Sequence, residues 1–236
     1  QNTIQYFIYF LIFAAICSLF LFKKDYVDTT NNSFTRDQTT SRALNEAFKH
    51  RGYMLLVAGF FVCGFQITLI ATHIPGYIQQ KGLPEWTAAA ILALIGFFNI
   101  FGTIGMGFLA SKYSKKILLS ILYFSRGVIL ILFLFLPPST FTALAFGVLF
   151  GILWLATIPP TNGIVAQIFG TKYLGTLFGI VFFSHQVGSF LGAYLGGYFF
   201  DTYGSYDYAW YLSILLSAFA GLVHLRIDEK PILRTA

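Results

Sequence analysis

Charged residues are scarce in this sequence, at 10% of its 236 residues, while hydrophobic residues make up 57%. A water-soluble domain of this length could not keep 28 phenylalanines and so many other apolar side chains away from water. The composition therefore excludes a soluble globular protein and indicates that the lipid bilayer is the solvent.

Cysteine and histidine are also few, and their positions exclude several kinds of site. Cys17 and Cys63 lie inside apolar runs without a partner at useful spacing, so we expect neither a disulfide framework nor a thiolate metal site. The four histidines lie on separate segments, without Asp or Glu at ligand spacing. We therefore expect no metal, no cofactor and no enzymatic activity.

Basic residues outnumber acidic ones, with fifteen Lys and Arg against nine Asp and Glu. A nucleic-acid-binding surface would gather them along one helix or patch, whereas here they are scattered over short loops. We expect no nucleic-acid partner and explain the excess by membrane topology.

Seven apolar runs are long enough to cross about 30 Å of hydrocarbon at about 1.5 Å per residue. All must be helices, because an open strand would leave its backbone groups unpaired in lipid. The sequence predicts an all-α membrane protein with seven transmembrane helices. They cover residues 4–22, 52–78, 86–111, 117–136, 141–168, 174–200 and 206–225.

The distribution of Lys and Arg between alternate loops predicts the orientation. One side carries thirteen, with six in 23–51, three in 112–116, Lys172, and three after residue 225. The other side carries Lys81 alone. By the positive-inside rule, the N-terminus of this chain lies outside and the C-terminus lies in the cytoplasm. We expect a multi-pass protein of the cell membrane.

These assignments divide the chain into four parts. They are a first transmembrane helix, a cytoplasmic loop, a six-helix unit and a cytoplasmic tail, at residues 1–22, 23–51, 52–226 and 227–236. The loop turns helical from Arg42 to Arg51. Its apolar stripe is suited to lying on the membrane surface and consists of Ala43, Leu44, Ala47 and Phe48.

Two stretches ninety residues apart, 107–114 and 197–204, share the pattern G-x-x-x-[S/D]-x-Y-[S/G]. Gly102 and Gly192 match at the same offset. A glycine before a polar turn ends many helices, but the charge count places the two stretches on opposite sides of the membrane. We therefore predict two inverted three-helix repeats, which are typical of transporters and cover residues 52–136 and 141–225.

Two prolines interrupt the fifth predicted span. Pro159 and Pro160 remove two backbone donors beside Asn162, which predicts a kink or break near the cytoplasmic half of that helix. A broken helix inside a bundle usually lines a cavity or a moving joint.

From Arg51 to its C-terminus, the chain resembles the second half of a major facilitator superfamily transporter, and its first span resembles the sixth of that family's twelve helices. The resemblance rests on residues 107–116, which are similar to the family's G-x-L-a-D-r-x-G-r-r loop between helices 8 and 9. It also rests on residues 179–188, followed by Gly196, Gly197 and 201–206. That second part looks like bacterial members grouped loosely with monocarboxylate and oxalate/formate carriers.

The resemblance implies a secondary transporter that works by alternating access, with a proton as the hypothetical coupling ion and an organic anion as the hypothetical solute. Five helices would then be missing before this chain, and the site would lie between two six-helix halves. Ser111 stands where the family's loop usually has Asp, and span 86–111 lacks the Arg that monocarboxylate carriers place there. The loop residues that inherit a gating role are Gly107, Ser111, Lys112, Lys115 and Lys116. We expect the lysines to serve mainly as topology determinants and as contacts for acidic lipid or side chains.

Arg126 is the strongest candidate for a binding residue, because it lies at the middle of a span, where a charge costs roughly 2.5 to 3.5 kcal/mol on insertion scales. A carboxylate solute would match its guanidinium fork. The alternative is a structural Arg that bonds carbonyls exposed at a kink such as Pro159-Pro160. Further solute-binding candidates are His185, Gln186, Asn162 and Gln66.

His185 and His73 are candidates for a coupling proton, because imidazole changes charge near neutral pH. A lone His in a span is more often a hydrogen-bonding residue between helices, and His73 lies close to the outer end of its span.

Two other functions remain open for a seven-helix protein. A receptor is disfavoured because a charged triplet after the third span and an Asn-Pro pair in the seventh are both missing, and a retinal protein because no span contains Lys. A non-transporting scaffold is compatible with the sequence, but the buried Arg and His favour a protein that binds polar solutes.

The charge count generates a topology prediction. A reporter fused after Lys116 or at the C-terminus should report cytoplasm, and one placed between Leu136 and Phe141 should report the outside. Reversed signals would overturn the predicted orientation.

Overall fold

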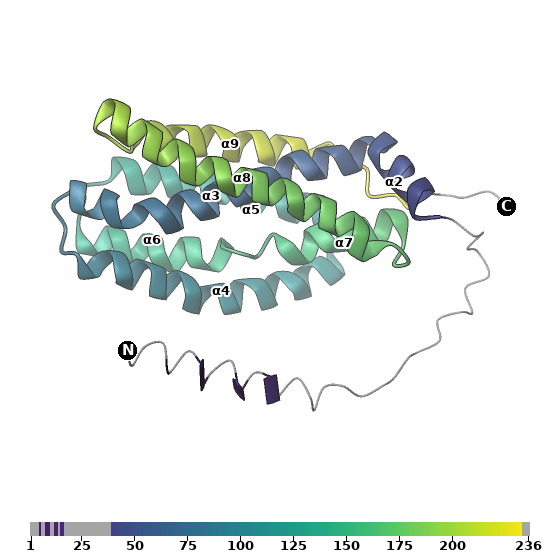
Figure 1. Ribbon diagram of the computed structural model, residues 1–236, viewed down its shortest axis with the longest axis horizontal. Coiled ribbons are helices and arrows are strands. Elements are labelled where there is room, and N and C mark those ends of the chain that lie inside the picture. The colour runs from purple at the N-terminus through teal and green to yellow at the C-terminus, as the bar shows by residue number, and fades with distance from the viewer. Residues whose placement is uncertain (1–4, 6–7, 10–11, 14, 17–38, 233–236) are drawn as a thin grey trace. The chain divides into compact units, whose positions relative to one another are not determined.

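The computed structural model describes residues 5, 8–9, 12–13, 15–16 and 39–232, and in this part of the chain the regular structure is helical without strands. Six stretches of the described chain are long and apolar enough to cross a membrane, with α6 and α7 sharing one of them. The helices (Figure 1) are α2 Thr40–Lys49, α3 Arg51–Gln80, α4 Trp86–Lys112, α5 Lys115–Phe135, α6 Thr140–Leu153, α7 Ile158–Phe169, α8 Leu174–Tyr203 and α9 Asp207–Leu225.

The first predicted span, residues 4–22, falls mostly outside the described residues. Those that are described within it are helical. The other six predicted spans agree with the observed helices to within a few residues, because runs of apolar residues this long have no other way to satisfy their backbone in lipid.

The predicted break divides one span into α6 and α7. Residues 154–157 leave the helix, and the two prolines occupy the second and third positions of α7. Neither can donate a backbone N–H, and each ring crowds the carbonyl four residues before it. The break therefore precedes the prolines and lies at the middle of the span, slightly earlier than predicted.

The most extensive packing joins α3 to α8, α4 to α6, and α5 to α9. A two-fold axis that exchanges the units α3–α5 and α6–α9 would exchange α3 with α6–α7, α4 with α8, and α5 with α9. It would map the α3–α8 contact onto the α4–α6 contact and the α5–α9 contact onto itself. The ends of α4 and α8, which carry Ser111 and Asp201, lie at opposite ends of the bundle (Figure 1). This arrangement agrees with two inverted repeats. We call the end with Lys112, Lys115 and Lys116, where α3 begins, the lysine-rich end.

Glycines stand at equivalent crossing points in the two units. A Cβ on Gly102 would overlap Ile152 O, and a Cβ on Gly192, ninety residues later, would overlap Phe65 O. A second pair of contacts repeats this correspondence. Gly151 lies against the backbone of Ile95, and Gly64 lies against the backbone of His185, which is ninety residues after Ile95. Lipid offers no hydrophobic drive between helices, so close backbone approach at small residues holds them together.

The amphipathic helix α2 packs part of its apolar stripe on the bundle. Ala43 and Ala47 are buried against the bundle, and Leu44 packs on the same core, while Phe48 stays exposed. The stripe therefore packs mainly on protein, with Phe48 left exposed. The spacing of apolar residues along a helix cannot distinguish protein from lipid as the partner, since both are apolar.

The glycine contacts generate a matched test within α4. Gly102→Ala should lower the free energy of unfolding by about 1–3 kcal/mol, because its Cβ meets a carbonyl oxygen. Gly105→Ala, one turn away with open space around it, should be neutral or stabilising. Thermal unfolding of the purified protein in detergent measures both, and equal effects would contradict the packing described.

Candidate functional site

Arg126 lies at the middle of α5 with its side chain fully buried. Its Nη2 donates to Leu153 O at 2.7 Å and to Trp154 O at 2.6 Å. These carbonyls belong to the last residue of α6 and the first residue of the break, where Ile158 N–H donates to Leu155 O instead of Trp154 O. The structure thus shows the contacts expected of an Arg that binds carbonyls exposed at a helix break. Hydrogen bonds of about 1.5–3 kcal/mol each to a charged group offset much of its burial cost.

The second terminal nitrogen of the guanidinium, Nη1, connects α5 to α3. Nη1 donates to Gln66 Oε1 at 3.3 Å and to Cys63 Sγ at 3.5 Å. Nε is buried and has no hydrogen-bond partner among the described residues. The Nε/Nη2 edge, the usual docking edge for a carboxylate, therefore keeps one free donor.

No carboxylate neutralises Arg126 within the described spans. Asp201 and Asp207 lie near the end of α8 and at the start of α9, at the opposite end of the bundle from the lysine-rich end. The rings of Tyr123 and Phe150 lie 5.4 and 5.7 Å from the guanidinium carbon. Among the described residues, backbone dipoles and aromatic faces therefore surround the positive charge in place of an ion pair.

Gln66 is fully buried on α3 and links Arg126 to α9. Its amide nitrogen donates to Ser213 O at 3.2 Å and to the Ser217 hydroxyl. The Ser217 hydroxyl donates in turn to Ser213 O at 3.0 Å. Because its amide nitrogen is held on α9, the Gln66 oxygen is oriented toward Arg126.

Cys63 connects the same cluster to the break and to α8. Its Sγ lies 3.2 Å from Thr157 Oγ1, a residue of the break, and the next residue, Gly64, packs against the backbone carbonyl of His185 on α8. His185 is nearly buried between the rings of Phe60 and Phe182, and its Nδ1 lies 3.2 Å from Gln186 Oε1. Gln186 itself is exposed.

Asn99, at the middle of α4, is a site residue that sequence reasoning missed. Its Oδ1 accepts the Leu155 N–H at 3.0 Å and the Thr103 hydroxyl at 3.1 Å. Asn99 thus accepts a hydrogen bond from a backbone N–H of the break, while Arg126 donates to the carbonyls of Leu153 and Trp154. The sequence feature that could have identified it is that Asn99 is a polar amide at the centre of the predicted span 86–111, which has no charged residue.

Two predicted site residues lie apart from this cluster. Asn162 is half-buried on α7 and, among the described residues, forms no hydrogen bond with the groups around Arg126. His73 lies toward the far end of α3, where Nε2 is 2.8 Å from Ala193 O and the ring packs on Tyr206. Its contacts are those of a hydrogen-bonding residue between helices.

The predicted loop residues gather at the lysine-rich end. The Ser111 hydroxyl donates to Phe108 O at 2.7 Å, and Lys112 Nζ lies 4.1 Å from the centre of the Phe108 ring. Lys115 Nζ donates to Gln167 Oε1 at 2.8 Å. Lys116 contacts the segment after α9, and Gly107 lies near Pro159. These lysines therefore make specific contacts with protein groups, in addition to the topological role expected from the sequence.

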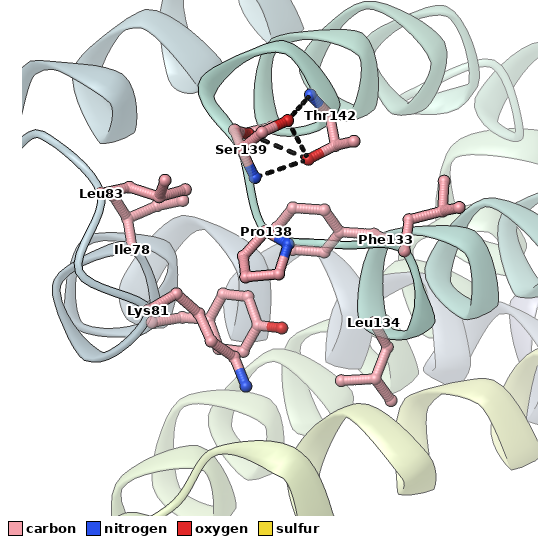
Figure 2. A pocket seen from close by; sticks show the side chains of 11 residues that line it. Ile78, Lys81, Leu83, Phe133, Leu134, Pro138, Ser139 and Thr142 are labelled. Atoms are coloured by element: carbon pink, nitrogen blue, oxygen red, sulfur yellow. Dashed lines mark hydrogen bonds between the residues drawn. The ribbon is translucent and has the colours of Figure 1, made fainter.

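A small pocket (Figure 2) is lined by residues from the end of α3, the end of α5 and the start of α6. These elements place it at the end of the bundle opposite the lysine-rich end. Apolar side chains such as Leu83 and Phe133 line most of it, and Lys81 Nζ lies 3.7 Å from Asp207 Oδ1. The described residues contain no group of three or more His, Cys, Asp or Glu arranged to hold a metal ion.

Comparisons with known proteins give a consistent result. The family model for the Major Facilitator Superfamily matches residues 4–192 and 127–235. The uncharacterised transporter YcxA of Bacillus subtilis is 33% identical over 156 residues, covering 64% of this chain and 38% of that protein. Monocarboxylate transporter 12-B of Danio rerio is 28% identical over 164 residues, covering 68% of this chain and 34% of that protein.

The fold also resembles a solved structure, the fucose:proton symporter of E. coli. The TM-score is 0.65 at 17% identity, covering 84% of this chain and 48% of the symporter. This chain therefore spans less than half the length of these proteins. The named relatives are transporters, in agreement with the expectation that the chain is not an enzyme.

The Asn99 contact generates a test of how the break is held. Asn99→Ala leaves the Leu155 N–H without its acceptor and should lower the free energy of unfolding by about 1–3 kcal/mol. Asn162→Ala, also half-buried, should change it by less than about 0.5 kcal/mol. Thermal unfolding in detergent distinguishes the two. Equal values would show that Asn99 does not stabilise the break.

Proposed function

This chain belongs to the major facilitator superfamily, and we propose that it forms the C-terminal part of a secondary transporter that moves a small solute by alternating access. It is a multi-pass membrane protein. Support for a missing N-terminal half comes from the lengths of its relatives and from α4, the least buried of the six spans. Exposed side chains along α4 include Phe97, Phe101, Ile104 and Phe108.

The orientation follows from charge. The lysine-rich end faces the cytoplasm and the N-terminus of this chain lies outside, in a cell membrane, because thirteen basic residues in loops are on one side and one is on the other. Residues 52–226 then form the C-terminal six-helix half, and 23–51 form the loop that connects it to the preceding helices.

A small organic anion is the solute that the site supports best. The observation that carries this proposal is the buried charge of Arg126, which has no carboxylate partner in the described spans and keeps a free Nε donor. A solute carboxylate would bind the Nε/Nη2 edge and release the carbonyls of Leu153 and Trp154. The monocarboxylate transporters among the relatives are compatible with this chemistry.

Proton coupling is assigned to His185 in preference to His73. The backbone of His185 packs against Gly64, the residue after Cys63, and Cys63 Sγ accepts Arg126 Nη1. A proton on the His185 imidazole would therefore change the charge close to the guanidinium. His73 lies at the far end of α3 and is held by a backbone carbonyl. Gln66 and Gln186 would orient the two charged groups.

Uptake of small monocarboxylates by the full-length protein in proteoliposomes tests this proposal. Arg126→Lys keeps the charge but loses the fork, so kcat/KM should fall at least about tenfold. The exposed Arg226→Lys is the matched control and should transport normally. Normal uptake by Arg126→Lys would show that Arg126 only stabilises the break.

Measuring the same uptake at several pH values between about 5 and 8 tests whether His185 carries the coupling proton. His185→Gln should flatten the pH dependence of uptake, whereas His73→Gln should retain it. An unchanged pH profile in His185→Gln would remove His185 from the coupling step.

A further inference from the structure

The segment after α9, residues 226–232, turns back across the lysine-rich end of the bundle. Ile227 is 1% exposed and enters the core beneath α2 and α3. Its carbonyl accepts Lys116 Nζ at 2.9 Å. The next carbonyl, of Asp228, passes so close to Gly52 that a Cβ there would lie 3.2 Å from it.

Glu229 attaches this segment to the start of α5. Its Oε1 accepts the Lys116 backbone N–H at 2.7 Å, and its Oε2 accepts the Ser114 hydroxyl at 2.8 Å. Ser114 occupies the N-cap position of α5 without capping it, and the first turn of α5 contains no acid. A carboxylate at a helix N-terminus satisfies a free N–H and interacts favourably with the helix dipole.

The same segment also binds the end of α7. Glu229 O accepts Gln167 Nε2 at 3.0 Å, and Ile232 N–H donates to Ile168 O at 3.0 Å. The segment thus supplies an acceptor to the beginning of one helix and a donor to the end of another. The two helices belong to different inverted units, so the segment connects the units at this end.

We propose that Glu229 fastens residues 226–232 as a strap between α5 and α7. The proposal goes beyond transport, because it holds whatever the solute is.

The two ends of α7 are held by different contacts. One end follows the break that Arg126 and Asn99 hold, and the other is bound at Ile168. Release of the strap should therefore loosen α7 and the first turn of α5. It should leave α6 unchanged, since α6 lies on the far side of the break.

Hydrogen exchange of the purified full-length protein tests this inference without any solute, so it can fail or succeed independently of the transport proposal. In Glu229→Ala and Glu229→Gln, the amides of 115–119 and 161–169 should exchange about tenfold faster or more. Those of 143–152 in α6 should keep their rates.

Asp228→Asn is the matched control, because Asp228 is exposed and its carboxylate accepts the neighbouring Lys230 N–H within the segment itself. Its exchange rates should equal those of the parent protein. Three results would overturn the proposal: unchanged exchange in both Glu229 variants, the same change in Asp228→Asn, or a uniform increase that includes α6.

Discussion

The positive charge of Arg126 in the middle of the bundle is the constraint on which the rest of the site depends. A guanidinium at this depth cannot reach water along its own helix, and the described spans provide no carboxylate to neutralise it. The charge is tolerated because the α6–α7 break presents two carbonyls to it. The Arg126 charge and the break therefore depend on each other. In an intact helix these carbonyls would accept backbone N–H groups of the same helix, and in a broken helix without Arg126 they would have no donor inside the membrane.

The inverted repeat places this pair where a solute site would be expected. Close glycine contacts at Gly102 and Gly192 bring the helices together at equivalent points of the two units. The polar residues Arg126, Gln66 and Asn99 each lie at the middle of a helix, at the level of the break. Transporters of this architecture bind their solutes near the bilayer midplane, at discontinuous helices. The strap that we propose connects the two units at the lysine-rich end of the bundle.

Much of the fold could be predicted from sequence, because long apolar runs and the Pro159-Pro160 pair permit few structures in lipid. The carbonyl contacts of Arg126 were also foreseen as one of two alternatives. Asn99 was missed because an uncharged amide stands out little in an apolar run. Glu229 was missed because the return of the chain after α9 has no periodic signal. Nothing in the residue pattern of α2 could tell whether protein or lipid covers its stripe.

On binding, a solute carboxylate should take the place of the break's carbonyls on Arg126, and the proposed function depends on this exchange. An experimental structure of the full-length protein with a bound monocarboxylate tests it most directly. We predict that the carboxylate lies within hydrogen-bonding distance of Arg126 Nε and Nη2, with Leu153 O and Trp154 O released. A carboxylate bound elsewhere, with both carbonyls still on Nη2, would contradict the proposed role of Arg126.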